Sequence, residues 1–267
     1  MTRCMSTHQL FEVTLVNMEN TLRVFEAEVP APELKPYGHG NMAYRYVEQS
    51  LLQAIIQKLA RMISGLRAAQ LLVEKGLLQE ACSIFRMLDE FREDVMFLCS
   101  GAGPGAATPL HKDYLRYFYL EEFENPDDAL GSQQKRPMVP REKIQAHLSR
   151  IEGSGLDPHT SIKVFKLLSK GYSGFVHAAS PQTMETYGGN PPHFHVRGML
   201  DTPLMIGAVD DLRTHFYRGI LSFGFAAHAF ALQPQFESIL RFRDHFEEKS
   251  GLDVTMPKLP ARKRPQK

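Results

Sequence analysis

The sequence predicts an all-α protein: a helical bundle with an antiparallel hairpin of two long helices and a long loop containing proline, glycine and histidine. Three observations predict this class. Apolar residues recur every three, four or seven positions along two neighbouring stretches. A single glycine separates these stretches, and a capping residue followed by proline marks two further helix starts.

The N-terminal stretch, residues 8–28, favours a helix, although its mixed apolar spacing leaves a strand open. Three closely spaced prolines then force an extended segment up to Gly40. We therefore expect an N-terminal helix and extended segment at 1–43 and a helical bundle domain at 44–250. The basic, proline-containing tail at 251–267 is expected to be disordered.

The long helices begin with one expected from Tyr44 to Gly76, a natural helix stop, and a second from Leu77 to Ser100. So short a connection requires an antiparallel hairpin. The apolar stripes are Leu51, Ile55, Leu59, Met62, Leu66 and Val73 on the first helix and Ile84, Leu88, Phe91, Val95 and Leu98 on the second.

Five further helices are expected, with a polar linker at 125–139. Asp157 before Pro158 and Thr202 before Pro203 are N-cap residues preceding a proline at the first helical position. Glycines and alanines between 207 and 229 let another helix approach closely, so we expect a homo-oligomer. The expected helices are 114–123, 140–151, 157–180 (ending at Pro181), 202–232 and 235–250.

Composition excludes several classes of protein. A net charge of +1 gives no global field for nucleic acid or an anionic membrane, although a local basic patch remains open. No apolar run is long enough to span a bilayer and no signal peptide is recognisable, so no membrane partner is expected. The three cysteines lack metal-type spacing and are expected to be reduced thiols in the cytoplasm.

The first candidate site residues are Arg86 and Glu90, four positions apart on the second long helix and therefore facing each other across one turn. With Asp89 and Glu93 they equally suit a solvated ion-pair face. A second group lies in the helix expected to end at Pro181. There Ser173 and Ser180 flank His177 on one face, as in a proton shuttle or phosphate binder, or around a satisfied core histidine.

The segments containing Arg86-x-x-x-Glu90 and Tyr172-x4-His177-x-x-Ser180 resemble a family of bacterial helical proteins, over about residues 50 to 180. That family is similar to helical domains of the higher eukaryotes and prokaryotes nucleotide-binding (HEPN) superfamily, many of which act in abortive infection or toxin–antitoxin systems. The resemblance implies a catalytic site of these five residues in a stress or phage-defence effector acting on RNA. His177 would move a proton, and Arg86, held by Glu90, would stabilise phosphate charge.

Active HEPN ribonucleases carry Arg-x(4–6)-His near a helix end, and the match here is Arg141 with His147. A chain of this composition contains such a pair by chance, so the motif carries no weight.

The loop at 181–201 offers a different chemistry, because His193 and His195 point to the same side of an extended chain. This is a metal-ligand spacing that Glu185 and His177 could complete with a divalent metal; otherwise no cofactor is expected. The loop is a lid, a metal site or a dimer arm. Two alternatives to the RNA effector therefore stay open: a metal-dependent hydrolase using His177, His193 and His195, and a non-catalytic oligomerisation or partner-protein-binding module. Whether the chain is an enzyme is also open.

Overall fold

The computed structural model describes residues 6–151, 163, 167 and 170–252. The predicted all-α class is confirmed, since long helices form the body and the strands form two short hairpins. Most of the helix expected from Asp157, the basic tail and Cys4 lie outside the described residues. The elements are α1 (Thr7–Ala27), β1 (Glu33–Pro36), β2 (Met42–Arg45), α2 (Leu51–Glu74), α3 (Leu78–Ser100), α4 (Pro109–Phe118), α5 (Arg141–Leu148), a helical segment at 170–176, α7 (Ser180–Met184), β3 (Tyr187–Gly188), β4 (His193–Phe194), α8 (Leu204–Ala229) and α9 (Gln233–Ser250).

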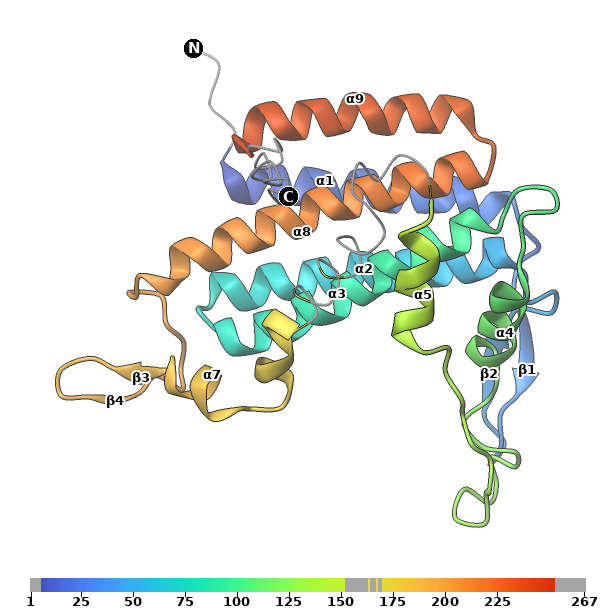
Figure 1. Ribbon diagram of the computed structural model, residues 1–267, viewed down its shortest axis with the longest axis horizontal. Helices are drawn as coiled ribbons and strands as arrows, with labels where there is room; N and C mark the ends of the chain where they lie inside the picture. Colours follow the sequence, from blue (N-terminus) through green and yellow to red (C-terminus); the bar gives the residue numbers. More distant parts are fainter. Residues whose placement is uncertain (1–5, 152–162, 164–166, 168–169, 253–267) are drawn as a thin grey trace, which may run out of the picture.

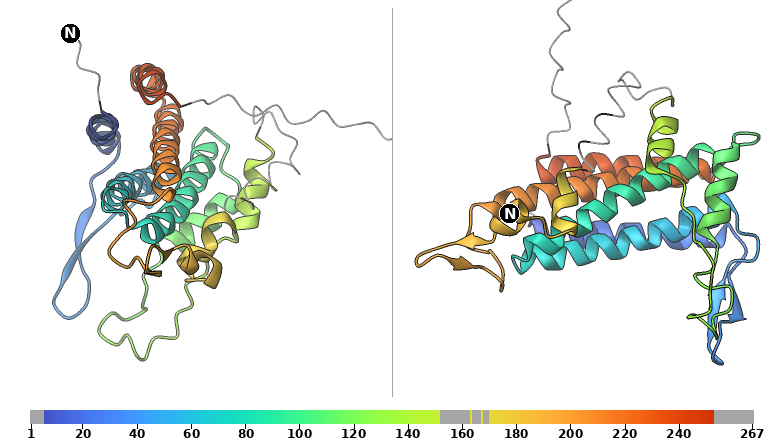
Figure 2. Two further views of the ribbon diagram at one scale, coloured as in Figure 1. Left: turned by 90° about the vertical axis from the view of Figure 1, so that its left-hand side faces the viewer. Right: turned by 60° about the horizontal axis from the view of Figure 1, so that its bottom comes forward.

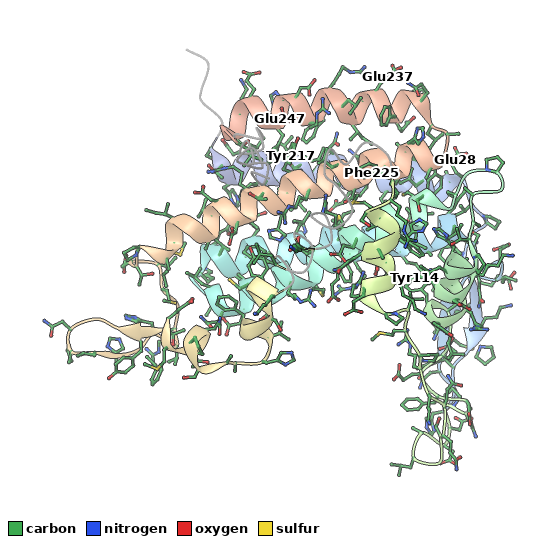
Figure 3. All side chains as sticks on the ribbon, viewed as in Figure 1. Glu28, Tyr114, Tyr217, Phe225, Glu237 and Glu247 are labelled. Carbon is green, nitrogen blue, oxygen red and sulfur yellow. The ribbon has the colours of Figure 1, made fainter. Side chains whose placement is uncertain are left out.

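Five long helices form the bundle (Figures 1 and 2). The α2–α3 hairpin is its centre, as the sequence predicts; α8 packs on both helices, and α1 and α9 pack against α8. Tyr217 on α8 donates a hydrogen bond of 2.7 Å to Glu247 on α9 (Figure 3). α1 shares the hydrophobic core with the hairpin. The largest fully buried side chains are Phe25, Phe85, Phe97, Phe216, Phe223 and Phe246.

The smaller elements gather at the two ends of the bundle (Figure 1). The β1–β2 hairpin and α4 lie at one end, and α7 with the β3–β4 hairpin lies at the other. No helix among the described residues is both long and apolar enough to cross a membrane.

The expected start of the first long helix at Tyr44 is wrong. Tyr44 belongs to β2 and pairs with Leu34 of β1, so the extended segment folds into a hairpin. The expected boundary at residue 43 falls inside β2. The helix begins at Leu51 because Ser50 and Gln53 form a capping box that satisfies the free backbone N–H groups of the first turn.

The aromatic helix expected at 114–123 also begins earlier, at Pro109. Thr108 is its N-cap, proline occupies the first turn, and the His111 ring takes the capping-box position usually filled by a glutamate or glutamine. The Thr108 backbone N–H donates to His111 Nδ1 at 3.1 Å. The imidazole therefore fixes this helix start.

The prediction that Pro181 ends a helix running to Ser180 is wrong as well. The helical segment ends at residue 176, and Pro181 lies in the first turn of α7, where a missing N–H has no cost. His177 and Ser180 therefore do not share a helix face with Ser173. The loop expected at 181–201 is structured, since it contains α7 and the β3–β4 hairpin.

Candidate functional site

Arg86 and Glu90 form the predicted ion pair on α3, with 2.8 Å between Arg86 Nη2 and Glu90 Oε1. Both side chains are partly exposed. Glu90 also borders a cavity beside the α2–α3 hairpin, so this pair lies at the edge of a recess.

The other residues implied by the resemblance are dispersed. Tyr172 packs against Phe85 and His215 and donates a hydrogen bond of 3.0 Å to Asp211 on α8. Burial and the Asp211 carboxylate raise the pKa of the Tyr172 phenol. His177 and Ser180 are exposed. Among the described contacts, none joins the His177 side chain to Arg86, Glu90 or Tyr172.

A solvated ion-pair face on α3 is not what the structure has, because Asp89, Glu93 and Asp94 are buried. Buried carboxylates need partners, since an unpaired charge away from water is strongly unfavourable. Each of the three lies within ion-pair distance of a cation from another element: α8 supplies the partner of Asp89, while α5 and α2 supply those of Glu93 and Asp94.

Asp94 is the centre of the larger cluster, with a side chain only 4% exposed. Lys58 Nζ from α2 lies 2.8 Å from Asp94 Oδ2, and Arg141 Nη1 from α5 donates to Asp94 Oδ1 at 2.7 Å. Burial, followed by the Asp94 charge and hydrogen bond, raises the pKa of the Tyr114 phenol. Tyr114 lies where α4 and α5 meet α3 (Figure 3). Three elements thus converge on one carboxylate.

A cavity of about 620 Å³ opens beside this cluster, within the usual range for small-molecule sites. Aromatic rings and cations share its wall. Lys58 Nζ lies 5.1 Å from the centroid of the Phe118 ring and 5.3 Å from that of Phe91, so the ammonium is stabilised by ring faces as well as by Asp94. The lining residues are Lys58, Glu90, Phe91, Asp94, Tyr114, Tyr117, Phe118, Arg136, Pro137, Met138, Val139, Pro140, Arg141 and Ile144.

Glu93 is buried beside Arg141, which lines the cavity. Gln145 Nε2 donates to both of its carboxylate oxygens at 3.3 Å, and Arg141 Nη1 lies 3.5 Å away. Burial raises the pKa of Glu93, and the Arg141 charge and the Gln145 hydrogen bond offset this only in part. Holding Glu93 ionised therefore costs stability.

Replacing Glu93 with glutamine is expected to raise the free energy of unfolding, and the increase should be larger at pH 8 than at pH 5. A group whose pKa is raised by folding contributes stability below its unfolded pKa, and that contribution is lost as the pH rises through the folded pKa. Glutamine does not ionise, so this loss disappears in the variant. Urea unfolding at both pH values measures the difference, with the exposed Glu122→Gln as control. An increase in the free energy of unfolding that is no larger at pH 8 than at pH 5 would contradict a raised pKa of Glu93.

A second polar cluster lies farther toward the α8 side of α3. Arg218 Nη1 donates to Asp89 Oδ1 at 2.8 Å, and His215 Nε2 lies 3.5 Å from the same oxygen. Burial opposes ionisation of Asp89, but the His215 hydrogen bond and the charges of Arg218 and Arg92 lower its pKa overall. Within the described residues, Asp89 Oδ2 and Arg92 Nε have no hydrogen-bond partner, and His215 Nε2 has only its long contact with Asp89 Oδ1. These residues border a space of about 10 Å³. One water molecule fits there, so this cluster is structural.

The residues of the discounted motif, Arg141 and His147, both lie on α5 but contact different groups. Arg141 reaches Asp94, whereas His147 Nε2 lies 2.9 Å from Ser100 Oγ. His111 Nε2 lies 3.2 Å from the same hydroxyl, and burial lowers the pKa of both imidazoles. His111 is fully buried and fixes the start of α4, so its role is structural.

His193 and His195 lie on and just after β4, with ring centroids 4.5 Å apart. The part of the chain that the structure describes holds no group of three or more His, Cys, Asp or Glu residues able to hold a metal ion. His177 and Glu185 therefore do not complete a site with this pair.

The sequence patterns do not point to Lys58 or Tyr114, and Arg141 enters them only through the discounted motif, although all three contact Asp94. One signal was available: Asp94 lies three residues after Phe91 and four before Leu98, inside the apolar stripe of α3. A charged residue in such a stripe predicts a buried partner. No family model, curated protein or solved structure matches the chain.

Proposed function

We propose that the chain binds a nucleoside monophosphate unit, either free or as the phosphorylated end of single-stranded RNA, in the cavity between α2, α3, α4 and α5. The observation that carries the proposal is the combination of aromatic rings, cations and carboxylates on one wall of about 620 Å³. RNA is the source that agrees with the resemblance to helical defence effectors.

The phosphate is assigned to Arg141 and Arg136. Among the described residues, Arg141 contacts Asp94 and Glu93 through Nη1, and we assign its other N–H groups to the ligand. Arg136 lines the cavity and is about half exposed, with Glu122 as its neighbour at 2.9 Å. A guanidinium matches the geometry of a phosphate because it offers two parallel donors.

The base is assigned to the aromatic side chains. Tyr117 and Phe118 line the cavity on α4, and Phe91 lines it on α3. Stacking of a base on such a ring is worth about 1–3 kcal/mol and does not depend on which base it is. Glu90, held by Arg86, supplies an acceptor for a ribose hydroxyl or an exocyclic amine. We propose binding only. Catalysis by His177 stays a prediction of the resemblance.

The test is calorimetric titration of the chain with 5′-AMP, compared with adenosine and with inorganic phosphate. Binding of 5′-AMP should be at least tenfold tighter than binding of either fragment, because base and phosphate use different parts of the wall. A 5′-phosphorylated RNA tetramer should compete with 5′-AMP if the natural ligand is an RNA end.

Arg136→Ala should weaken 5′-AMP binding about tenfold, since one charge-assisted contact contributes roughly 1.5 kcal/mol. Arg23→Ala is the matched control, because Arg23 is exposed on α1 and does not line the cavity. The proposal is contradicted if the two variants bind 5′-AMP with equal affinity, or if the unmodified chain does not bind 5′-AMP.

A further inference from the structure

We propose that His193 and His195 form half of a zinc site that a second copy of this chain completes. The inference concerns the β3–β4 hairpin and is independent of the nucleotide proposal. Its first support is backbone geometry: the two residues are two positions apart, so an extended chain presents both rings on one side. The rings lie 4.5 Å apart, centroid to centroid, and are tilted by 44°.

The proton on His193 is placed by its hydrogen bond. Nδ1 lies 2.9 Å from the backbone carbonyl oxygen of Pro191. A carbonyl oxygen accepts, so Nδ1 carries the proton and Nε2 keeps its lone pair. Metal-binding histidines usually donate their other N–H to a carbonyl or carboxylate, which fixes both tautomer and ring orientation. His193 has this arrangement.

Gly189 lies beside both rings. A Cβ atom built on this residue would lie 3.4 Å from His193 Cε1, 3.6 Å from His193 Nδ1 and 3.4 Å from His195 Nε2. His193 thus turns its Cε1–Nδ1 edge toward Gly189, and Nδ1 on that edge is already bonded to Pro191, so Nε2 is the nitrogen left for a metal. The glycine has φ +88°, where other residues are strained, and leaves the space beside both rings open.

One chain supplies two nitrogen ligands here, and no third His, Cys, Asp or Glu joins them among the described residues. Zinc in a structural site takes four ligands in a tetrahedron. A twofold axis through the metal places the same pair of histidines from a second copy opposite the first, which gives four imidazoles. The ligand set of one hairpin is therefore incomplete without its symmetry mate.

The position of the hairpin allows this approach. It projects from the end of the bundle, clear of the long helices (Figures 1 and 2). Tyr187 and Phe194 pack on each other across the hairpin and remain nearly half exposed, and Val196 is 80% exposed. Burying these side chains against a second copy adds apolar contact beside the metal.

The experiment uses full-length chain without a histidine tag, stripped with a chelator and titrated with ZnCl₂. Light scattering measures the molecular mass, and elemental analysis measures zinc after free metal is removed. We expect one zinc ion per two chains and a doubling of the mass relative to the stripped protein, whatever its resting state.

His193→Ala and His195→Ala should each abolish the zinc-dependent doubling, and Gly189→Val should do so by placing a side chain against both rings. His177→Ala is the control and should leave zinc content and mass unchanged. One zinc ion per chain without a change in mass, zinc binding that survives both histidine variants, or loss of binding in His177→Ala would each overturn the proposal.

Discussion

Replacing Asp94 with alanine is expected to lower the free energy of unfolding by about 3 kcal/mol or more. The side chain is 4% exposed, and Lys58 and Arg141 lie within 2.8 Å and 2.7 Å of its oxygens. Removing the carboxylate leaves two largely buried cations without the charge that lies between them, and only Glu93, 3.5 Å from Arg141, remains beside the pair. The cost comes from these stranded charges more than from the lost attraction.

Chemical denaturation of the two proteins at pH 7 measures this loss. Asp244→Ala is the matched control, because Asp244 is exposed on α9 and pairs with its chain neighbour Arg243; its removal should change stability by less than about 0.5 kcal/mol. A loss below about 1 kcal/mol for Asp94→Ala would mean that the cluster is hydrated and that the cavity wall is not fixed by it.

Replacing Gly76 with alanine is expected to cost roughly 2–4 kcal/mol. The residue has φ +71°, and an added Cβ would lie 2.6 Å from the backbone nitrogen of Met199 and 2.7 Å from that of Leu200. These are main-chain atoms, so no side-chain rotation relieves the contact. The segment also donates a hydrogen bond from Met199 N to Gly76 O at 2.8 Å, which the alanine would displace.

Thermal unfolding of Gly76→Ala tests this expectation against Gly207→Ala. Gly207 lies inside α8 with no other atom within 4 Å of an added Cβ, so alanine there should raise stability by about 0.5–1 kcal/mol. If both variants are equally stable, the 198–200 segment moves freely away from the turn between α2 and α3. The β3–β4 hairpin then has no fixed position on the bundle.

The helical bundle could be predicted because the patterns that indicate each helix lie within short stretches of the sequence. The stripes of α2 and α3 have the helical period, and Gly76 between them marks the turn. Helix starts were less predictable, because Ser50 with Gln53 and Thr108 with His111 compete with the apolar pattern for where the first turn forms. Proline is ambiguous for a similar reason: Pro181 begins a helix where a stop was expected.

The candidate site also has one part that the sequence predicts and one part that depends on the folded packing. The Arg86–Glu90 pair follows from spacing on one helix. The contacts of Asp94 with Lys58 and Arg141 join α3 to α2 and α5, and only the folded packing brings these helices together. The resemblance linked Arg86 to His177 through motifs on separate elements, and no described contact joins those two side chains.

The most direct test of the nucleotide proposal is a methyl NMR titration of the chain with 5′-AMP. Met138 and Ile144 line the cavity, whereas Met18 on α1 and Ile239 on α9 are buried in the core away from it and report on general effects. Saturating 5′-AMP is expected to shift the Met138 and Ile144 methyl signals and to leave those of Met18 and Ile239 in place. Unchanged Met138 and Ile144 signals at saturating 5′-AMP would contradict the nucleotide proposal.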